Sequence, residues 1–321
     1  MDRRRRRTGA LTLILVAGAW AAMAADPGPP LRAMRWMSPE ANLRNALSET
    51  PTECLRPPQA PRAAQAVRIG RAAFRTPLLL GGQAARAGLT CESCHRAGRG
   101  NPDFQFPGAS GAPGTADVTL SLFSSHRGNG VHDPRPIPDL SGTRTALKVA
   151  PKELPDFIRG LIVEEFDGPE PPAAVLEGLV AYVSALDPAA CPHAPSTPVT
   201  LATTMADARL AVAAAGTALA EGDPSTANLM IAAARAQLGL IDERYAAFPD
   251  DRARLRRADA DLASLQAAIR ERRPDAAAQL AGSTGGLTAL ETRLARREPA
   301  SLFNPEQLAR AANRRLPPRA S

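Results

Sequence analysis

The apolar residues between positions 61 and 74 recur at intervals of three and four along the chain. This spacing gathers them on one face of a helix, and Pro61 suits its first turn, where no amide hydrogen is needed. Gly70 lies at the centre of the face and, lacking a side chain, would let a second helix approach closely. The predicted face comprises Ala63, Ala66, Val67, Gly70, Ala73 and Phe74.

A second apolar face with the same period is predicted over residues 173–186, beside Tyr182. We expect this helix to cross the first one, with a further helix at about 154–166 between them in sequence. The Pro-rich, polar stretch before position 61 holds one short helical candidate, residues 40–47, and is expected to wrap around the outside. The second face comprises Leu176, Leu179, Val180, Val183 and Leu186.

After a proline-rich stretch at 192–198 the pattern becomes one of long helices with a coiled-coil-like alternation of three and four. Short connections between long helices imply antiparallel neighbours, so we expect a bundle of about four helices. A fifth, shorter helix is predicted at 305–313. Residues that suit turns and helix starts mark the predicted breaks. These breaks are Gly222-Asp223-Pro224, Pro249-Asp250, Pro274-Asp275 and Gly285-Gly286.

These patterns predict an all-α protein in four parts. Residues 1–24 form a signal peptide, 25–60 an N-terminal wrapping segment, 61–194 a helical domain, and 195–321 a C-terminal antiparallel helical bundle.

Residues 1–24 have the three parts of a secretory signal. Arg3 to Arg7 supply positive charge, Leu11 to Trp20 an apolar core, and Ala22-Met23-Ala24 a cleavage site of small residues. The apolar stretch is short for a membrane-spanning helix, although an uncleaved anchor is the alternative. We therefore expect export to the periplasm, with the mature chain beginning near Ala25.

The formal net charge of +7 is concentrated in the signal, whose five arginines and one aspartate account for four of these charges. The mature chain has no basic arm or patch, so the sequence gives no support to nucleic-acid binding. It also has no later apolar run long enough to span a bilayer.

The pentad Cys91-Glu92-Ser93-Cys94-His95 carries the strongest chemical signal in the chain. A Cys-x-x-Cys-His run is typical of c-type haem attachment, in which the two thiols form thioethers with the haem and the histidine ligates its iron. The alternatives are a zinc site, which would have to recruit distant ligands to reach four, and a free redox-active cysteine pair. The pentad favours one covalently bound haem c.

The residues around the pentad resemble a haem domain of the di-haem cytochrome c peroxidase (MauG-like) family. The similarity rests on Phe74, Gly81-Gly82, residues 89–95, and the stretch from Ile137-Pro138-Asp139-Leu140 to Leu179-Val180-Ala181-Tyr182. It implies a cytochrome c-like fold for residues 61–194, with Pro138 lying against the haem near its proximal ligand, His95. The chain departs from that family in having a single pentad, and no methionine lies between His95 and Met205.

The sixth ligand of the iron remains open at this point. His126 and His132 lie in a Gly-rich loop, and either is a candidate for the distal position. Met34 and Met37, in the N-terminal segment, are others, while Tyr182 is better explained as a packing residue. An open coordination position is the remaining possibility.

Cys54 and Cys191 are left over, one on each side of the predicted haem domain. An even number of cysteines in an exported chain favours pairing, and crossing helices would bring the ends of the domain together. We predict a disulfide between them, with two buried free thiols as the alternative.

Two functions follow from these observations. The first is an exported mono-haem cytochrome that passes single electrons to and from an exported redox partner. The second, which the family resemblance adds, is a peroxidase-like enzyme that reduces hydrogen peroxide at an open haem iron. It would need a general acid–base, for which His126, His132, Glu164 or Glu165 are candidates. The bundle is expected to be a spacer or scaffold, or else to dock the partner or pair two copies of the chain.

Overall fold

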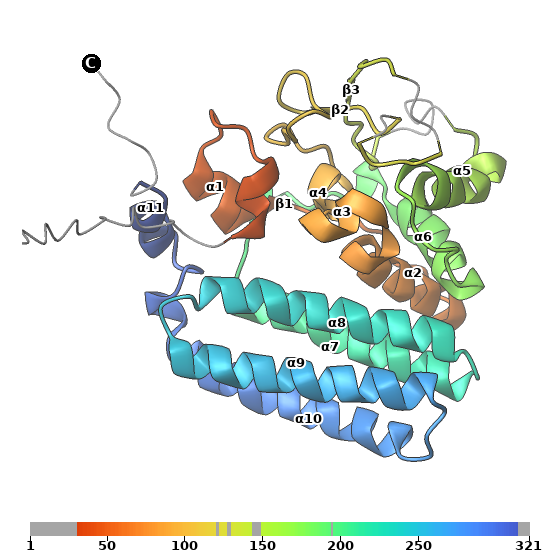
Figure 1. Cartoon of the computed structure of the whole chain (residues 1–321), viewed down its shortest axis with the longest axis vertical. Helices are drawn as coiled ribbons and strands as arrows, with labels where there is room; N and C mark the ends of the chain where they lie inside the picture. Colours follow the sequence, from red (N-terminus) through yellow and green to blue (C-terminus); the bar gives the residue numbers. More distant parts are fainter. Residues whose placement is uncertain (1–30, 120–121, 127–129, 143–148, 194, 314–321) are drawn as a thin grey trace, which may run out of the picture.

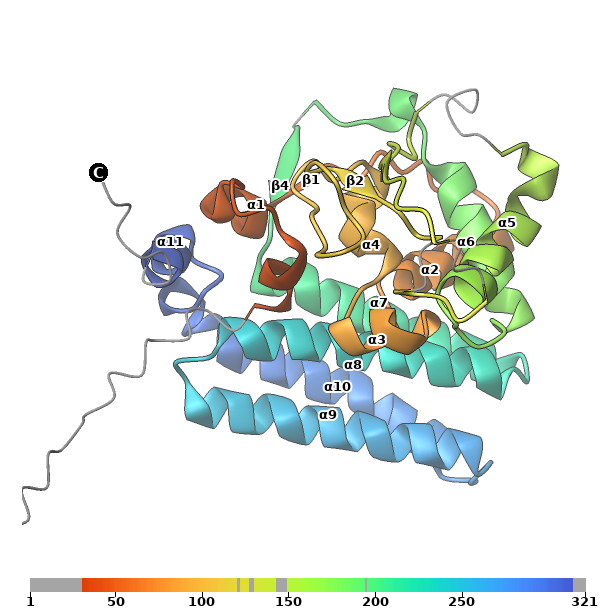
Figure 2. The same ribbon diagram turned by 45° about the horizontal axis from the view of Figure 1, so that its top comes forward.

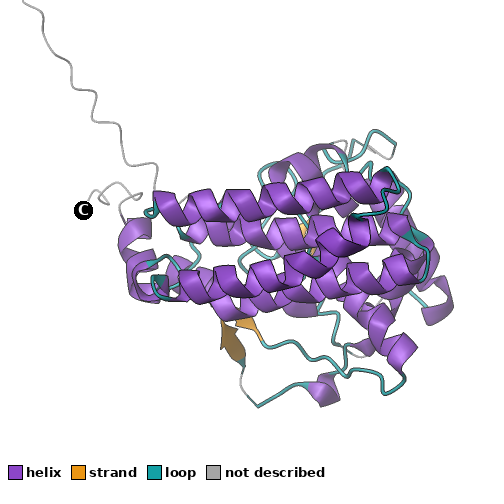
Figure 3. Cartoon of the chain, turned by 90° about the horizontal axis from the view of Figure 1, so that it is seen from below, coloured by secondary structure: helices purple, strands orange, loops and turns teal. Residues whose placement is uncertain are grey.

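The computed structural model describes residues 31–119, 122–126, 130–142, 149–193 and 195–313. Helices dominate this part of the chain, and its strands are only two or three residues long, as the all-α prediction requires (Figure 3). The predicted signal peptide falls outside the described residues. Within the described ranges, no helix combines the length and the apolar character needed to cross a bilayer.

Helices α2 (Pro61–Phe74) and α6 (Ala173–Ala185) pack against each other, as predicted. They meet at two glycines: a Cβ atom on Gly70 would lie only 1.9 Å from the backbone oxygen of Gly178. The buried face of α6 differs slightly from the predicted one. Val175 and Gly178 are buried, whereas Leu176 and Val180 are only partly so, because the contact is centred on Gly178.

Short elements connect these two helices. They include α3 (Gly82–Ala87), α4 (Cys91–Cys94) and α5 (Leu154–Gly160), and α5 continues as a π-helical turn, Leu161–Glu165. Strands β2 (Thr115–Ala116) and β3 (Arg135–Pro136) pair antiparallel. Single 3-10 turns lie at Pro77–Leu79, Arg96–Gly98, Pro151–Glu153 and Pro188–Ala190.

The segment before α2 contacts the beginning and the end of the described C-terminal part, 195–313. It contains a 3-10 turn, Arg32–Trp36, then α1 (Leu43–Ser48) and β1 (Glu49–Pro51). Strand β1 pairs antiparallel with β4 (Ser196–Pro198), and α1 packs against α11 (Pro305–Asn313), as Figure 2 shows.

The C-terminal part consists of four long helices that lie side by side (Figures 1 and 2). They are α7 (Leu201–Ala220), α8 (Pro224–Arg244), α9 (Pro249–Arg270) and α10 (Ala276–Ala295), and α7 and α9 each contact both α8 and α10.

The predicted break at Gly285-Gly286 is wrong, because α10 runs through both glycines. Each glycine costs a helix about 1 kcal/mol relative to alanine. Leu287, Leu290 and Leu294 follow on the same helix and are buried. Their burial, at roughly 1.5–3 kcal/mol per side chain, outweighs that cost.

Helix α2 also packs against α7 and α8, so the helical domain rests directly on the bundle (Figure 2). Buried apolar side chains form one continuous cluster through both.

Candidate functional site

The turn that carries the pentad is fixed by its own polar residues. The Thr90 hydroxyl accepts a hydrogen bond from the Ser93 amide at 3.2 Å, and the Ser93 hydroxyl accepts one from the Thr90 amide at 3.0 Å. This reciprocal capping box starts α4 at Cys91. The side-chain amide of Asn101 donates to the Ser93 backbone carbonyl at 2.8 Å. The Glu92 carboxylate accepts a hydrogen bond from the backbone amide of Ala97 at 2.9 Å. The two middle residues of the pentad therefore hold its shape.

Cys91 and Cys94 are both free thiols on this single turn, and both pack against the apolar core. Burial raises the pKa of each thiol to about 12. Redox-active Cys-x-x-Cys pairs instead have lowered thiol pKa values, because the thiolate is the reactive form. These surroundings therefore do not favour the free redox pair.

His95 is oriented by the main chain of a distant residue. Its Nδ1 lies 3.0 Å from the carbonyl oxygen of Pro138. Burial lowers the pKa of His95 to about 4, so the ring is neutral at pH 7. Since a carbonyl can only accept, Nδ1 carries the proton, and the Nε2 lone pair is left for a metal. A metal-ligating histidine typically donates the N–H of its other ring nitrogen to a carbonyl or carboxylate in this way.

The Pro138 segment is itself anchored next to the pentad. The Leu140 amide donates to the Gly98 carbonyl at 3.0 Å, and the Arg99 side chain donates to the Asp139 carboxylate at 2.6 Å. Pro138 thus lies next to His95 through its carbonyl. That the proline lies against a haem, as the family resemblance implies, stays a prediction.

None of the contacts that the structure describes links His126 or His132 to the pentad. His126 is exposed, with its Nε2 3.8 Å from Asp167. His132 is also exposed and lies in the electrostatic neighbourhood of Asp117. Ligation of the iron by either residue stays a prediction.

The other candidates have structural surroundings of their own. Met34 and Met37 pack against a small cluster formed by Leu31, Leu47 and Leu308. Tyr182 is fully buried, and its hydroxyl donates to Glu53 at 2.6 Å, as expected of a packing residue. In the π-helical turn, Glu165 is buried and Glu164 partly buried.

Cys54 and Cys191 form a disulfide, with their Cα atoms 4.1 Å apart. Cys54 is completely buried and Cys191 is exposed. The Arg99 guanidinium lies 3.2 Å from the Cys54 sulfur, so one arginine contacts both the disulfide and the segment that orients His95.

Sequence reasoning missed a cluster of partly buried charges between α2 and α7. Arg71 forms ion pairs with Glu53, at 2.8 Å, and with Asp207. Arg75 forms ion pairs with Glu53 at 3.3 Å and with Glu92 at 3.5 Å. The available signal was the spacing of Arg71 and Arg75, which places two cations one turn apart on a helix that is otherwise largely apolar.

Among the described residues, no group of three or more His, Cys, Asp or Glu side chains is arranged to hold a metal ion. Such a group is what the zinc alternative requires. Comparisons of the chain with protein families, curated proteins and solved structures gave no match.

Proposed function

We propose that this chain is an exported c-type cytochrome that carries one covalently bound haem and transfers single electrons. The proposal includes a cytochrome c-like fold for residues 61–194 and an antiparallel arrangement of the bundle helices. The observation that carries it is one juxtaposition. Two free thiols share a turn whose next residue, His95, has Nδ1 engaged by Pro138 and Nε2 available.

The donor set fits haem c. Cys91 and Cys94 would hold the group through thioethers, and His95 would ligate the iron. When bound, the haem supplies one-electron Fe(III)/Fe(II) chemistry at a potential set by its axial ligands and surroundings.

The other requirements of electron transfer fall to residues of the chain that hold the thiols and the His95 ring in place. The capping box of Thr90 and Ser93 holds the two thiols on one turn. The Pro138 carbonyl fixes the tautomer and orientation of the His95 ring. Buried apolar side chains of the surrounding core exclude water, and the capped turn and anchored imidazole limit the rearrangement that a change of charge demands. Phe74 is one of these side chains: it is buried, and its ring centroid lies 6.4 Å from that of His95.

Expression with a c-type maturation system, followed by mass spectrometry of the denatured mature chain, tests the proposal. We expect the added mass of one haem and a 1:1 haem content. Cys91→Ala/Cys94→Ala should lose all covalent haem, whereas the matched pair Cys54→Ala/Cys191→Ala should retain it. A mature chain without added mass would overturn the proposal.

The spectrum of the loaded protein separates electron transfer from peroxide reduction. A low-spin, six-coordinate iron in both oxidation states supports the carrier. A high-spin ferric iron with rapid peroxide turnover would replace the carrier with the peroxidase-like function suggested by the family resemblance.

A further inference from the structure

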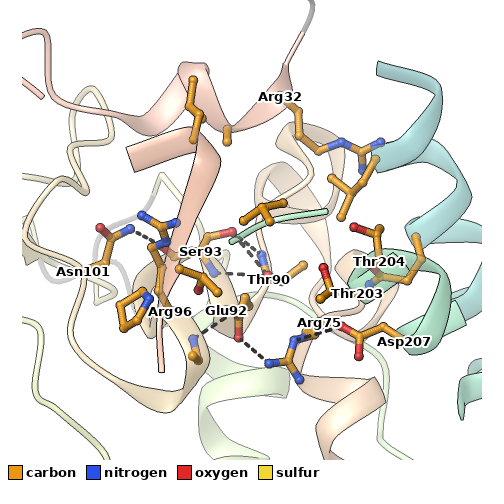
Figure 4. Close-up of a pocket in the computed structure, with 18 of the residues that line it drawn as sticks. Arg32, Arg75, Thr90, Glu92, Ser93, Arg96, Asn101, Thr203, Thr204 and Asp207 are labelled. Carbon is orange, nitrogen blue, oxygen red and sulfur yellow. Dashed lines mark hydrogen bonds and ion pairs between the residues drawn. The ribbon is translucent and has the colours of Figure 1, made fainter. Parts of the chain in front are cut away.

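A cavity of about 490 Å³ lies between the pentad turn, the N-terminal segment and helices α7 and α8 (Figure 4). Its size is typical of small-molecule sites. Five arginines and three carboxylates line it among the described residues: Arg32, Arg71, Arg75, Arg96, Arg244, Glu53, Glu92 and Asp207.

This cavity lies on the other side of the pentad turn from the haem-binding atoms. Thr90, Glu92, Ser93 and Arg96 line it, whereas Cys91, Cys94 and His95 do not. Figure 4 shows Arg96 and Asn101 on one side, Arg75 and Asp207 on the other, and Glu92 between them. The cavity is therefore separate from the proposed haem site and needs an explanation of its own.

Most of the charges in the cavity are already paired. Arg71 and Arg75 share Glu53, Asp207 and Glu92, so this end of the cavity has no excess of positive charge. Arg32, near the N-terminal segment, forms an ion pair with Glu243 at 2.5 Å.

Arg96 and Arg244 are different. Arg96 donates to the Glu49 carbonyl at 2.5 Å. Arg244 donates to the Leu47 carbonyl at 2.5 Å and to the Leu302 carbonyl at 2.6 Å, and it lies over the Phe303 ring. Because the Glu49 and Leu47 carbonyls are two residues apart in the chain, the two guanidinium groups converge on one place. Among the described residues, neither guanidinium has a carboxylate within 4.0 Å.

In the described part of the chain, neither arginine has a directly paired carboxylate; Glu92 and Asp103 act on Arg96, and Glu243 acts on Arg244, only from a greater distance. Two partly buried cations that share a site also repel each other. Burial lowers the pKa of Arg244 to about 10; the Glu243 carboxylate opposes this shift and the charge of Arg96 adds to it. Backbone carbonyls satisfy part of the hydrogen-bonding capacity of these groups but supply no net negative charge. An oxyanion such as a phosphate or a carboxylate would supply both charge and bidentate acceptors.

We propose that this cavity is a binding site for a small organic anion. Arg96 and Arg244 bind its phosphate or carboxylate group, and its apolar body packs against lining residues such as Trp36 and Leu240. The proposal does not depend on haem binding, because none of the atoms it uses belongs to the pentad's thiols or imidazole.

Isothermal titration calorimetry of the mature protein tests this site, with phenyl phosphate, benzoate and inorganic phosphate as probes. Benzyl alcohol serves as the neutral analogue and sodium chloride as the ionic-strength control. We expect at least one organic anion to bind tenfold or more tightly than benzyl alcohol. Preference for phenyl phosphate or for benzoate identifies the head group, and binding of inorganic phosphate shows whether the body contributes.

Arg96→Gln and Arg244→Gln should each weaken binding at least tenfold. Arg86→Gln is the matched control, because Arg86 is exposed and outside the cavity. If a glutamine variant fails to fold, by circular dichroism, the double variant Arg96→Lys/Arg244→Lys retains the charges and should retain measurable binding. Absence of anion binding to the wild-type protein, or equal loss in Arg86→Gln, would overturn the proposal.

A second readout rests on the proposed function. An anion behind the pentad turn favours the more positive ferric iron, so the bound probe should lower the midpoint potential of the haem-loaded protein. Binding without a change in potential would leave the anion site in place and remove only its coupling to the haem.

Discussion

The imidazole Nδ1 of His95 and the carbonyl oxygen of Pro138 lie 3.0 Å apart although 43 positions separate them in the chain. The contact fixes one tautomer of a ring that follows directly after two free thiols. It is a backbone contact, so it depends on the path of the chain at Pro138 more than on the proline side chain.

The first prediction concerns the role of His95. His95→Ala should keep the thioether-bound haem, because Cys91 and Cys94 are untouched, but should lose the spectrum of an imidazole-ligated iron. Absorption and electron paramagnetic resonance spectra of the purified protein measure this change. His126→Ala and His132→Ala are the controls, and whichever of them alters the spectrum identifies the sixth ligand. An unchanged spectrum in His95→Ala would contradict the assignment.

A second prediction follows from the helix crossing. Gly70→Ala places a Cβ atom 1.9 Å from the backbone oxygen of Gly178, so α2 and α6 must separate. We expect the free energy of unfolding to fall by about 3 kcal/mol, the upper range for overpacking a core. Urea denaturation followed by circular dichroism provides the measurement, and a loss below 1 kcal/mol would show that the helices separate easily.

The same substitution should have the opposite effect in α10. Gly285 is exposed within a helix, and no atom lies within 4 Å of the position of an added Cβ. Gly285→Ala should therefore raise the free energy of unfolding by about 1 kcal/mol, the difference in helix propensity. A decrease in stability would indicate that the exposed face of α10 is covered in solution.

The disulfide gives a third test of stability. It links residues 137 positions apart, and the chain-entropy model assigns about 5 kcal/mol to closing a loop of that length. Cys54→Ala/Cys191→Ala should lower the free energy of unfolding by about that amount, and reductant should then have no further effect. Two labelled cysteines in the native, alkylated protein, beyond those of the pentad, would contradict the pairing.

The last prediction concerns the stability of the protein at acid pH. Burial alone would raise the pKa of Glu53, but the two arginines and the Tyr182 hydroxyl outweigh it and hold the pKa below its ordinary value of 4.5. The stabilisation from Glu53 is thus complete above pH 4.5 and is lost as the pH falls through the lower, folded-state pKa. Glu53→Gln should cost about 3 kcal/mol at pH 7, as expected for breaking a buried ion pair.

That difference between wild type and Glu53→Gln should shrink as the pH falls below 4.5, because protonation removes the same charge. Denaturant unfolding of both proteins at pH 7, 5, 4 and 3 measures it. A constant difference across this range would show that the charge of Glu53 contributes nothing.

Local patterns were sufficient for the parts of the fold that obey them. The three-and-four spacing gave α2 and most of the bundle helices, and Gly70 marked the crossing with α6. The pentad gave the candidate site because its five residues are adjacent. The break predicted at Gly285-Gly286 was wrong because helix propensity is a local property, whereas the stability of α10 depends on leucines buried against other helices.

The cavity could not be predicted in the same way. Arg96 and Arg244 are 148 positions apart, and each binds a carbonyl of the same short segment. Nothing in the spacing of either residue indicates a common site. Long-range meetings of this kind depend on the three-dimensional path of the chain, which periodicity does not encode.

The pairing of β1 with β4, together with the packing of α1 on α11, has a consequence for how the protein can be divided. If the chain were divided at position 195, one fragment would hold β1 and α1 without their partners. The other would hold β4 and α11 without theirs. We therefore expect the bundle to fold together with residues 61–194 and not as a detachable appendage.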